Sequence, residues 1–88
     1  MTKDHFKSLL NVSGGQFAFQ TDRHEGMIGI SPASVVVWVD DIDADGDEPK
    51  YIGEYKSVNE LLEKFKVDDE HFVANILPKI TNLNMLKT

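Results

Sequence analysis

The chain contains no cysteine, and this absence excludes several classes of protein. There is no disulfide framework, no thiolate nucleophile and no zinc site built from cysteine ligands. The sequence also lacks an apolar run long enough to cross a membrane, and no apolar segment follows the N-terminal lysine as it would in a secretory signal. These features predict a cytoplasmic protein, and the length of 88 residues fits a single domain over residues 1–88.

Basic residues are also few, with nine Lys and Arg against fifteen Asp and Glu and a net charge of −6. The acidic excess is local, because residues 40–48 hold six acids and no base, while the rest of the chain holds nine of each. The six acids are Asp40, Asp41, Asp43, Asp45, Asp47 and Glu48. This acidic segment disfavours direct binding to nucleic-acid phosphates, and it is suited to docking on a basic protein surface.

The sequence has no set of residues that specifies a reaction. A nucleophile, a base and an orienting group in a recognisable pattern are missing, so we expect neither an enzyme nor a cofactor. The three histidines, His5, His24 and His71, form no local pair with metal-ligand spacing. We therefore expect them to be ordinary surface residues.

The first part of the chain has the patterns of one helix and several strands. Phe6, Leu9 and Leu10 follow helical spacing, and Gly14-Gly15 is expected to end that helix. Strand patterns follow at 16–21, 27–30, 35–39 and 50–55. The run 35–39 is the most β-branched of these and predicts the central strand, paired with 50–55 as a hairpin.

Two helices are predicted after the strands. Ser57 and Glu60 form a capping box for the first, with an apolar stripe that includes Leu62. Asp68 is expected to cap the second, which carries Phe72, Ile76, Ile80 and Leu83 and breaks or kinks at Pro78. The prediction is an α+β fold of order α-β-β-β-β-α-α. A small, mainly antiparallel sheet of three to four strands has an N-terminal helix and two C-terminal helices.

The segment 41–47 resembles the opening of a calcium-binding loop. Asp41, Asp43, Asp45 and Asp47 alternate with other residues, and Gly46 permits a sharp turn. The closing half of the motif is missing, because Ile52 stands where the bidentate glutamate belongs and the flanks have strand patterns. A turn at Asp45-Gly46 in an exposed hairpin explains the same residues. A calcium site through Asp41, Asp43, Asp45 and Asp47 is therefore the alternative, with weak affinity.

The apolar central strand has too many apolar side chains for one sheet face. If Val35, Val37 and Val39 face the helices together with Ile52, then Val36, Trp38, Tyr51 and Tyr55 lie on the opposite face. An exposed patch of these residue types is typical of an interaction surface. We expect a small acidic protein-binding or regulatory, inhibitor-like module. It would contact a protein partner or a second copy through Val36, Trp38, Tyr51 and Tyr55 and through the acids of 40–48.

Overall fold

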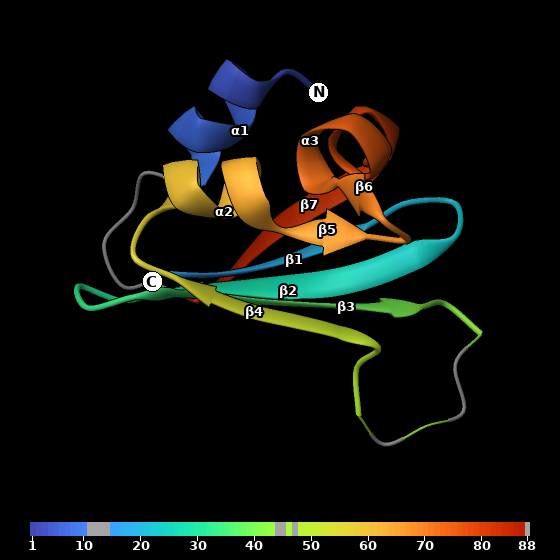
Figure 1. The fold of residues 1–88 in the computed structure, drawn as a ribbon. Helices are drawn as coiled ribbons and strands as arrows, with labels where there is room; N and C mark the ends of the chain where they lie inside the picture. The colour runs from blue at the N-terminus through green and yellow to red at the C-terminus, as the bar shows by residue number, and fades with distance from the viewer. Residues whose placement is uncertain (11–14, 44–45, 47, 88) are drawn as a thin grey trace.

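The computed structural model describes residues 1–10, 15–43, 46 and 48–87. It confirms an α+β fold in which helices cover one face of an antiparallel sheet (Figure 1). The sheet has five strands in the order β4-β3-β2-β1-β7, one more than the sequence predicted. Its strands are β1 (Gln16–Gln20), β2 (His24–Ile30), β3 (Val35–Asp41), β4 (Tyr51–Tyr55) and β7 (Asn82–Lys87). No helix among the residues described is long and apolar enough to cross a membrane.

The N-terminal helix α1 (Lys3–Leu10) begins at a capping threonine. The Thr2 hydroxyl accepts a hydrogen bond from the His5 amide at 3.1 Å, so it satisfies one of the amides that a helix start leaves free. Phe6 and Leu10 are buried, as predicted, whereas Leu9, which was predicted to lie on the same apolar stripe, is 41% exposed. Of the two glycines expected to end this helix, Gly14 lies outside the described residues.

The helix α2 (Val58–Lys64) begins at the predicted capping box. The Ser57 hydroxyl accepts from the Glu60 amide at 3.2 Å, and the Glu60 carboxylate accepts from the Lys56 amide at 3.3 Å. Leu61 and Leu62 are both buried beneath the helix. Local capping and the apolar stripe therefore agree on the position of this element.

The segment after α2 differs from the predicted long helix. Asp68 does not cap a helix; it lies with Asp69 in a tight turn between the short strands β5 (Lys66–Val67) and β6 (Glu70–His71). Their φ angles of 55° and 66° fall in the left-handed region, which aspartate tolerates better than most residues. The helix α3 (Phe72–Asn75) is short, and Pro78 lies in the 3₁₀ turn η1 (Leu77–Lys79), so the predicted break is present. Leu83 belongs to β7.

The core lies between the sheet and the helices. Phe72 of α3 is fully buried, with its ring centroid 5.7 Å from Phe6, 5.6 Å from Phe19 and 5.9 Å from Phe65. These four rings come from α1, β1, the end of α2 and α3, so they join the three α-helices to the sheet. Aromatic clusters of this kind add to the stability gained from burial alone.

The strand faces are as predicted for β3 but reversed for β4. Val35, Val37 and Val39 are buried against the helices, as expected. Tyr51 and Tyr55, predicted to lie with Trp38, instead face the core, and Ile52, predicted to be inside, is 65% exposed. The reason is register. Val39 pairs with Tyr51, Val35 with Tyr55 and Trp38 with Ile52, and directly opposed antiparallel residues share a face.

Candidate interaction surface

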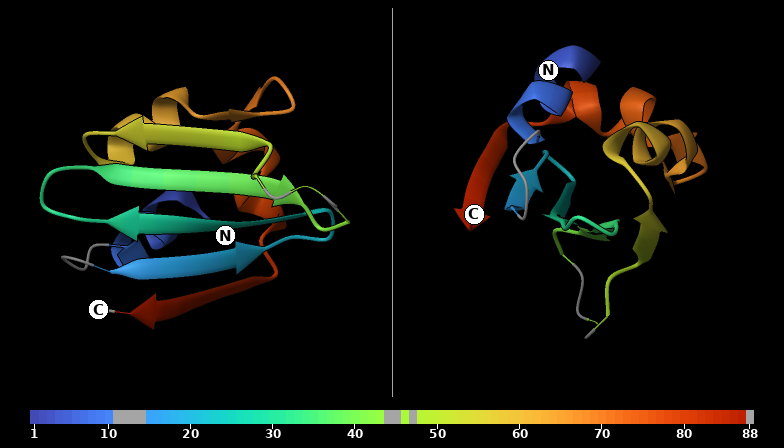
Figure 2. Two further views of the ribbon diagram at one scale, coloured as in Figure 1. Left: turned by 90° about the horizontal axis from the view of Figure 1, so that it is seen from below. Right: turned by 90° about the vertical axis from the view of Figure 1, so that its left-hand side faces the viewer.

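The sheet face away from the helices, which we call the open face, is uncovered in the part of the chain that the structure describes (Figure 2). Successive residues of a strand alternate between the faces, and the register aligns the outward ones in rows. One row crosses four strands: Ala18, Met27, Trp38 and Ile52 stand side by side as cross-strand partners. Val36 lies beside this apolar row and is 40% exposed. A continuous apolar strip therefore runs across the open face.

Acidic residues flank this strip. Glu25 and Asp40 are direct cross-strand partners in the row on one side, and Glu54 pairs with Val36 on the other. None of the three forms an ion pair with a described residue. Like charges directly opposite one another destabilise a sheet, and the ion pairs among the described residues neutralise neither Glu25 nor Asp40.

A hollow of about 220 Å³ indents the open face beside Trp38. Trp38 and Met27 line one side, and Asn82 and Asn84 of the edge strand β7 line the other. Ala18 also lines it, and Glu25 and Gln20 contribute polar groups. The hollow thus combines an aromatic side chain, a carboxylate and several amides.

The structure brings together only part of the patch predicted from the sequence. Val36 and Trp38 share the open face with Asp40. Asp41 is the last residue of β3, and Asp43 and Glu48 belong to the β3–β4 connection. Asp45 and Asp47 lie outside the described residues. Met27 and Ile52 were not predicted to belong to this patch, because the phase of a strand alone does not reveal which residues stand opposite Trp38.

A cluster of polar side chains holds both ends of the β3–β4 connection on the helix-covered side. We call it the His24 cluster; its members are His24, Asp41, Lys50, Tyr51 and Asp68. His24 is 5% exposed, which corrects the prediction of a surface histidine. Its Nε2 lies 3.2 Å from Asp68 Oδ2 and 3.5 Å from Asp41 Oδ1.

Tyr51 and Lys50 complete the cluster. The Tyr51 hydroxyl donates to Asp68 Oδ1, and Lys50 Nζ lies 3.7 Å from Asp41 Oδ2. The hydrogen bond from Tyr51 holds the pKa of Asp68 below its ordinary value of 3.8. The same bond raises the pKa of Tyr51, and the negative charge of Asp41 raises the pKa of Lys50.

These shifts favour the ordinary charge state of each group at neutral pH. Asp68 stays ionised, Tyr51 stays protonated and Lys50 stays cationic, so none of them is adjusted toward acid–base work near pH 7. The His24 cluster instead joins the end of β3, the start of β4 and the β5–β6 turn. It therefore fixes the frame from which the acidic connection extends.

The described part of the predicted cation site offers little to a metal ion. Asp41 is engaged with His24 and Lys50, and no group of three His, Cys, Asp or Glu side chains among the described residues is arranged to hold a metal. Asp43 is exposed, while Asp45 and Asp47 lie outside the description. The calcium alternative stays a prediction.

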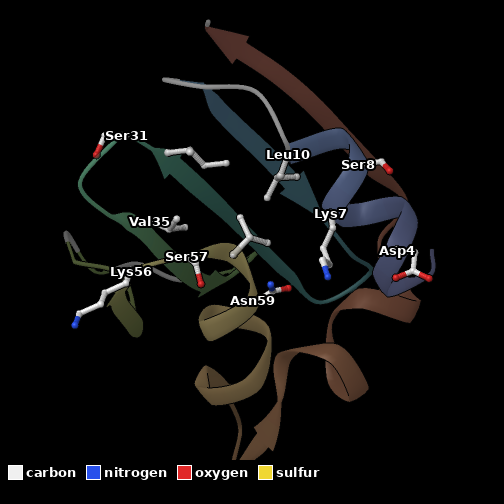
Figure 3. A pocket seen from close by; sticks show the side chains of 11 residues that line it. Asp4, Lys7, Ser8, Leu10, Ser31, Val35, Lys56, Ser57 and Asn59 are labelled. Atoms are coloured by element: carbon white, nitrogen blue, oxygen red, sulfur yellow. The ribbon is translucent and has the colours of Figure 1, made fainter.

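A larger cavity of about 690 Å³ opens between α1, the β2–β3 turn and the start of α2 (Figure 3). Leu10 and Val35 contribute apolar surface to it. Figure 3 shows Lys7 pointing into the cavity beside Asn59, whereas the amine of Lys56 points away from it. The polar side chains that line it are spread over α1, the β2–β3 turn and the start of α2, so the cavity does not define a specific ligand site.

Comparison of the chain with protein-family models, with curated proteins and with solved structures gave no match.

Proposed function

We propose that this protein is a non-catalytic binding module that uses the open face to occupy a basic surface of another protein. The proposal is supported by the arrangement of the face, in which the apolar strip of Met27, Trp38 and Ile52 is flanked by Glu25, Asp40 and Glu54. Protein interfaces commonly combine an apolar centre containing Trp with a charged rim. By occupying that surface the module would act as an inhibitor or regulator.

The charge of the rim selects the kind of partner. All charged strand residues whose side chains the structure describes on this face are acidic, so a second copy docked face to face would bring carboxylates against carboxylates. Like-charge contacts of this kind cost several kcal/mol across an interface. A partner with basic side chains around an apolar centre relieves the Glu25–Asp40 repulsion instead. The same acidic field disfavours nucleic acid.

The acidic β3–β4 connection adds to this function. It extends from the strip-bearing strands β3 and β4, and the His24 cluster fixes its ends. Its charge would increase the association rate with a basic protein through long-range attraction. We place this interaction in the cytoplasm, in keeping with a chain that has no cysteine to oxidise.

The test is affinity capture from cells of the source organism with four forms of the protein. Wild type and Leu9→Lys should retain the same basic protein, and Ile52→Lys and Trp38→Ser should lose it. Leu9 is the matched control, because it is an exposed apolar side chain on α1, away from the open face. Retention should weaken as salt rises. Equal capture by Ile52→Lys and wild type would contradict the proposal.

A further inference from the structure

We infer that the hollow beside Trp38 receives an arginine side chain of the partner protein. This inference rests on the proposed function and identifies the group that the open face recognises. It concerns the space between Trp38 and the edge strand β7, at the end of the apolar strip opposite Ile52.

The walls of the hollow suit a cation with an apolar stem. Trp38 provides an aromatic side chain, and indole attracts cations more strongly than the other aromatic rings do. Met27 and Ala18 offer apolar contact for the methylene groups of the stem. Glu25, which also lines the hollow, supplies the negative charge.

The carboxylates near the hollow lack a cationic partner within the described residues. Glu25 stands directly opposite Asp40, and the ion pairs of the described chain involve neither of them. Asp40 Oδ1 accepts a hydrogen bond from the neighbouring Asp41 amide at 2.9 Å. A cation placed beside Glu25 would offset the repulsion between the two carboxylates. A cationic side chain should therefore bind in the hollow more tightly than a neutral one.

Arginine fits the polar lining of the hollow better than lysine does. The guanidinium is planar, carries five donors and lies flat against aromatic rings, whereas the ammonium of lysine is a compact, strongly hydrated charge. The lining of the hollow offers acceptors from several directions: the carboxylate of Glu25 and the side-chain oxygens of Gln20, Asn84 and Asn82. The Asn82 oxygen also accepts a hydrogen bond from Asn84 Nδ2 at 3.0 Å. A planar donor group can reach two of these sides at once.

The arginine would come from a protein surface and not from a free metabolite. The hollow is open and continues into the apolar strip of Met27, Trp38 and Ile52, which a free arginine would leave uncovered. A partner would bury the strip and insert one side chain at its end. The hollow thus acts as a specificity pocket within a larger contact.

Blocked tripeptides with a central residue between two leucines test this inference by ¹H–¹⁵N NMR. The central residue is arginine, lysine or the neutral isostere citrulline. Trp38 is the only tryptophan, so its indole signal and fluorescence report on the hollow. The arginine peptide should shift the Trp38 indole and the side-chain amides of Asn82 and Asn84 saturably. Lysine should bind several-fold more weakly, and citrulline should give no saturable shift.

Two matched variants separate the effect of the Glu25 carboxylate in the hollow from the effect of the overall negative charge of the open face. Glu25→Gln should weaken the arginine peptide about tenfold, because a charge-assisted bond is lost. Glu54→Gln removes an equal charge on the other side of the apolar strip and should leave the affinity unchanged. Equal binding of the citrulline or lysine peptide, or equal effects of both variants, would overturn the inference.

The outcome is separable from that of the proposed function. If no peptide shifts Trp38 but a basic protein is still captured in an Ile52-dependent manner, the arginine pocket is wrong and the docking face stands. If the arginine peptide binds as expected but capture does not depend on Ile52, the pocket exists and the proposed docking face is wrong.

Discussion

Asp68 is the residue that ties the β5–β6 turn to the sheet. Its two carboxylate oxygens serve different partners, with Oδ1 accepting from the Tyr51 hydroxyl and Oδ2 lying 3.2 Å from His24 Nε2. Its φ of 55° is costly for a residue other than glycine, and these contacts offset that cost. The turn therefore depends on contacts made outside it.

Replacing Asp68 with asparagine should lower the free energy of unfolding at pH 7 by about 1 kcal/mol, a small value because the side chain is 45% exposed. The folded-state pKa is lowered, so the stabilisation by the carboxylate is complete above its ordinary value of 3.8 and is lost as pH falls through the lower folded value. The difference between wild type and Asp68→Asn should therefore shrink in that acidic range. Urea unfolding at several pH values measures it.

Asp69→Asn is the control for this prediction. Asp69 lies in the same turn with a φ of 66°, so both substitutions make the same chemical change in a similar backbone conformation. Its stability should match that of wild type within about 0.5 kcal/mol, as for most surface changes. Equal losses for both variants would show that the contacts to Tyr51 and His24 contribute nothing.

At the aspartates of the β3–β4 connection we predict no tight calcium site. Asp41 is held by His24 and Lys50, and Ile52 replaces the closing glutamate of a calcium loop. Millimolar calcium should produce only small, fast-exchanging amide shifts near Asp43. Saturable binding below about ten micromolar, the range of calcium-sensor loops, would contradict this.

Two glycines of β2 differ in the space that they leave for a side chain, and substituting each of them tests the packing of the sheet. A Cβ on Gly26 would lie 2.5 Å from the Trp38 carbonyl oxygen and closer still to the Phe19 ring, whereas a Cβ on Gly29 would meet nothing within 4 Å. Gly26→Ala should therefore cost about 2 kcal/mol or more through overpacking. Gly29→Ala should leave stability unchanged or raise it by about 0.5 kcal/mol. Thermal unfolding of both variants checks the prediction, and similar midpoints would contradict the register.

The elements that the sequence predicted well have strong local signals. In β3 the run of β-branched residues predicts a strand, and α2 has both a cap and a stripe, so local chemistry decides that these elements form. In β4 the pattern is ambiguous, because Tyr51 and Tyr55 compete with Ile52 for the core. Pairing with β3 turns the two tyrosines toward the core, where the ring centroid of Tyr55 lies 6.2 Å from that of Phe65.

Other elements depend on distant partners and had no local signal. The strand β7 lacks β-branched residues, and it forms because β1 offers it an unpaired edge. His24 is buried through a partner 44 positions away in Asp68, which no local spacing reveals. The candidate surface was predicted only in part. The alternation of side chains along β3 places Val36 and Trp38 on one face, but Met27 and Ile52 join them only through the register with β2 and β4.

At the scale of the whole molecule, one core carries the stability of every element. Leu62, 4% exposed beneath α2, belongs to the same buried cluster as the strand and helix residues. Leu62→Ala should lower the free energy of unfolding by about 2 to 5 kcal/mol, with a single cooperative transition. Leu9→Ala on the exposed side of α1 should change it by less than about 0.5 kcal/mol. Chemical denaturation followed by circular dichroism compares the two, and a mild effect at Leu62 would contradict its burial.

The pairing of β7 with β1 also has a consequence for the order of assembly. Strands β1 to β4 follow one another along the chain and can associate through short loops. The contact between Thr81 and Gln20 instead joins residues 61 positions apart. On the ribosome, β1 would therefore wait with a bare outer edge until residues 82–87 have emerged. An unpaired strand edge recruits other chains, so the interval before β7 docks is when this protein is most exposed to misassembly.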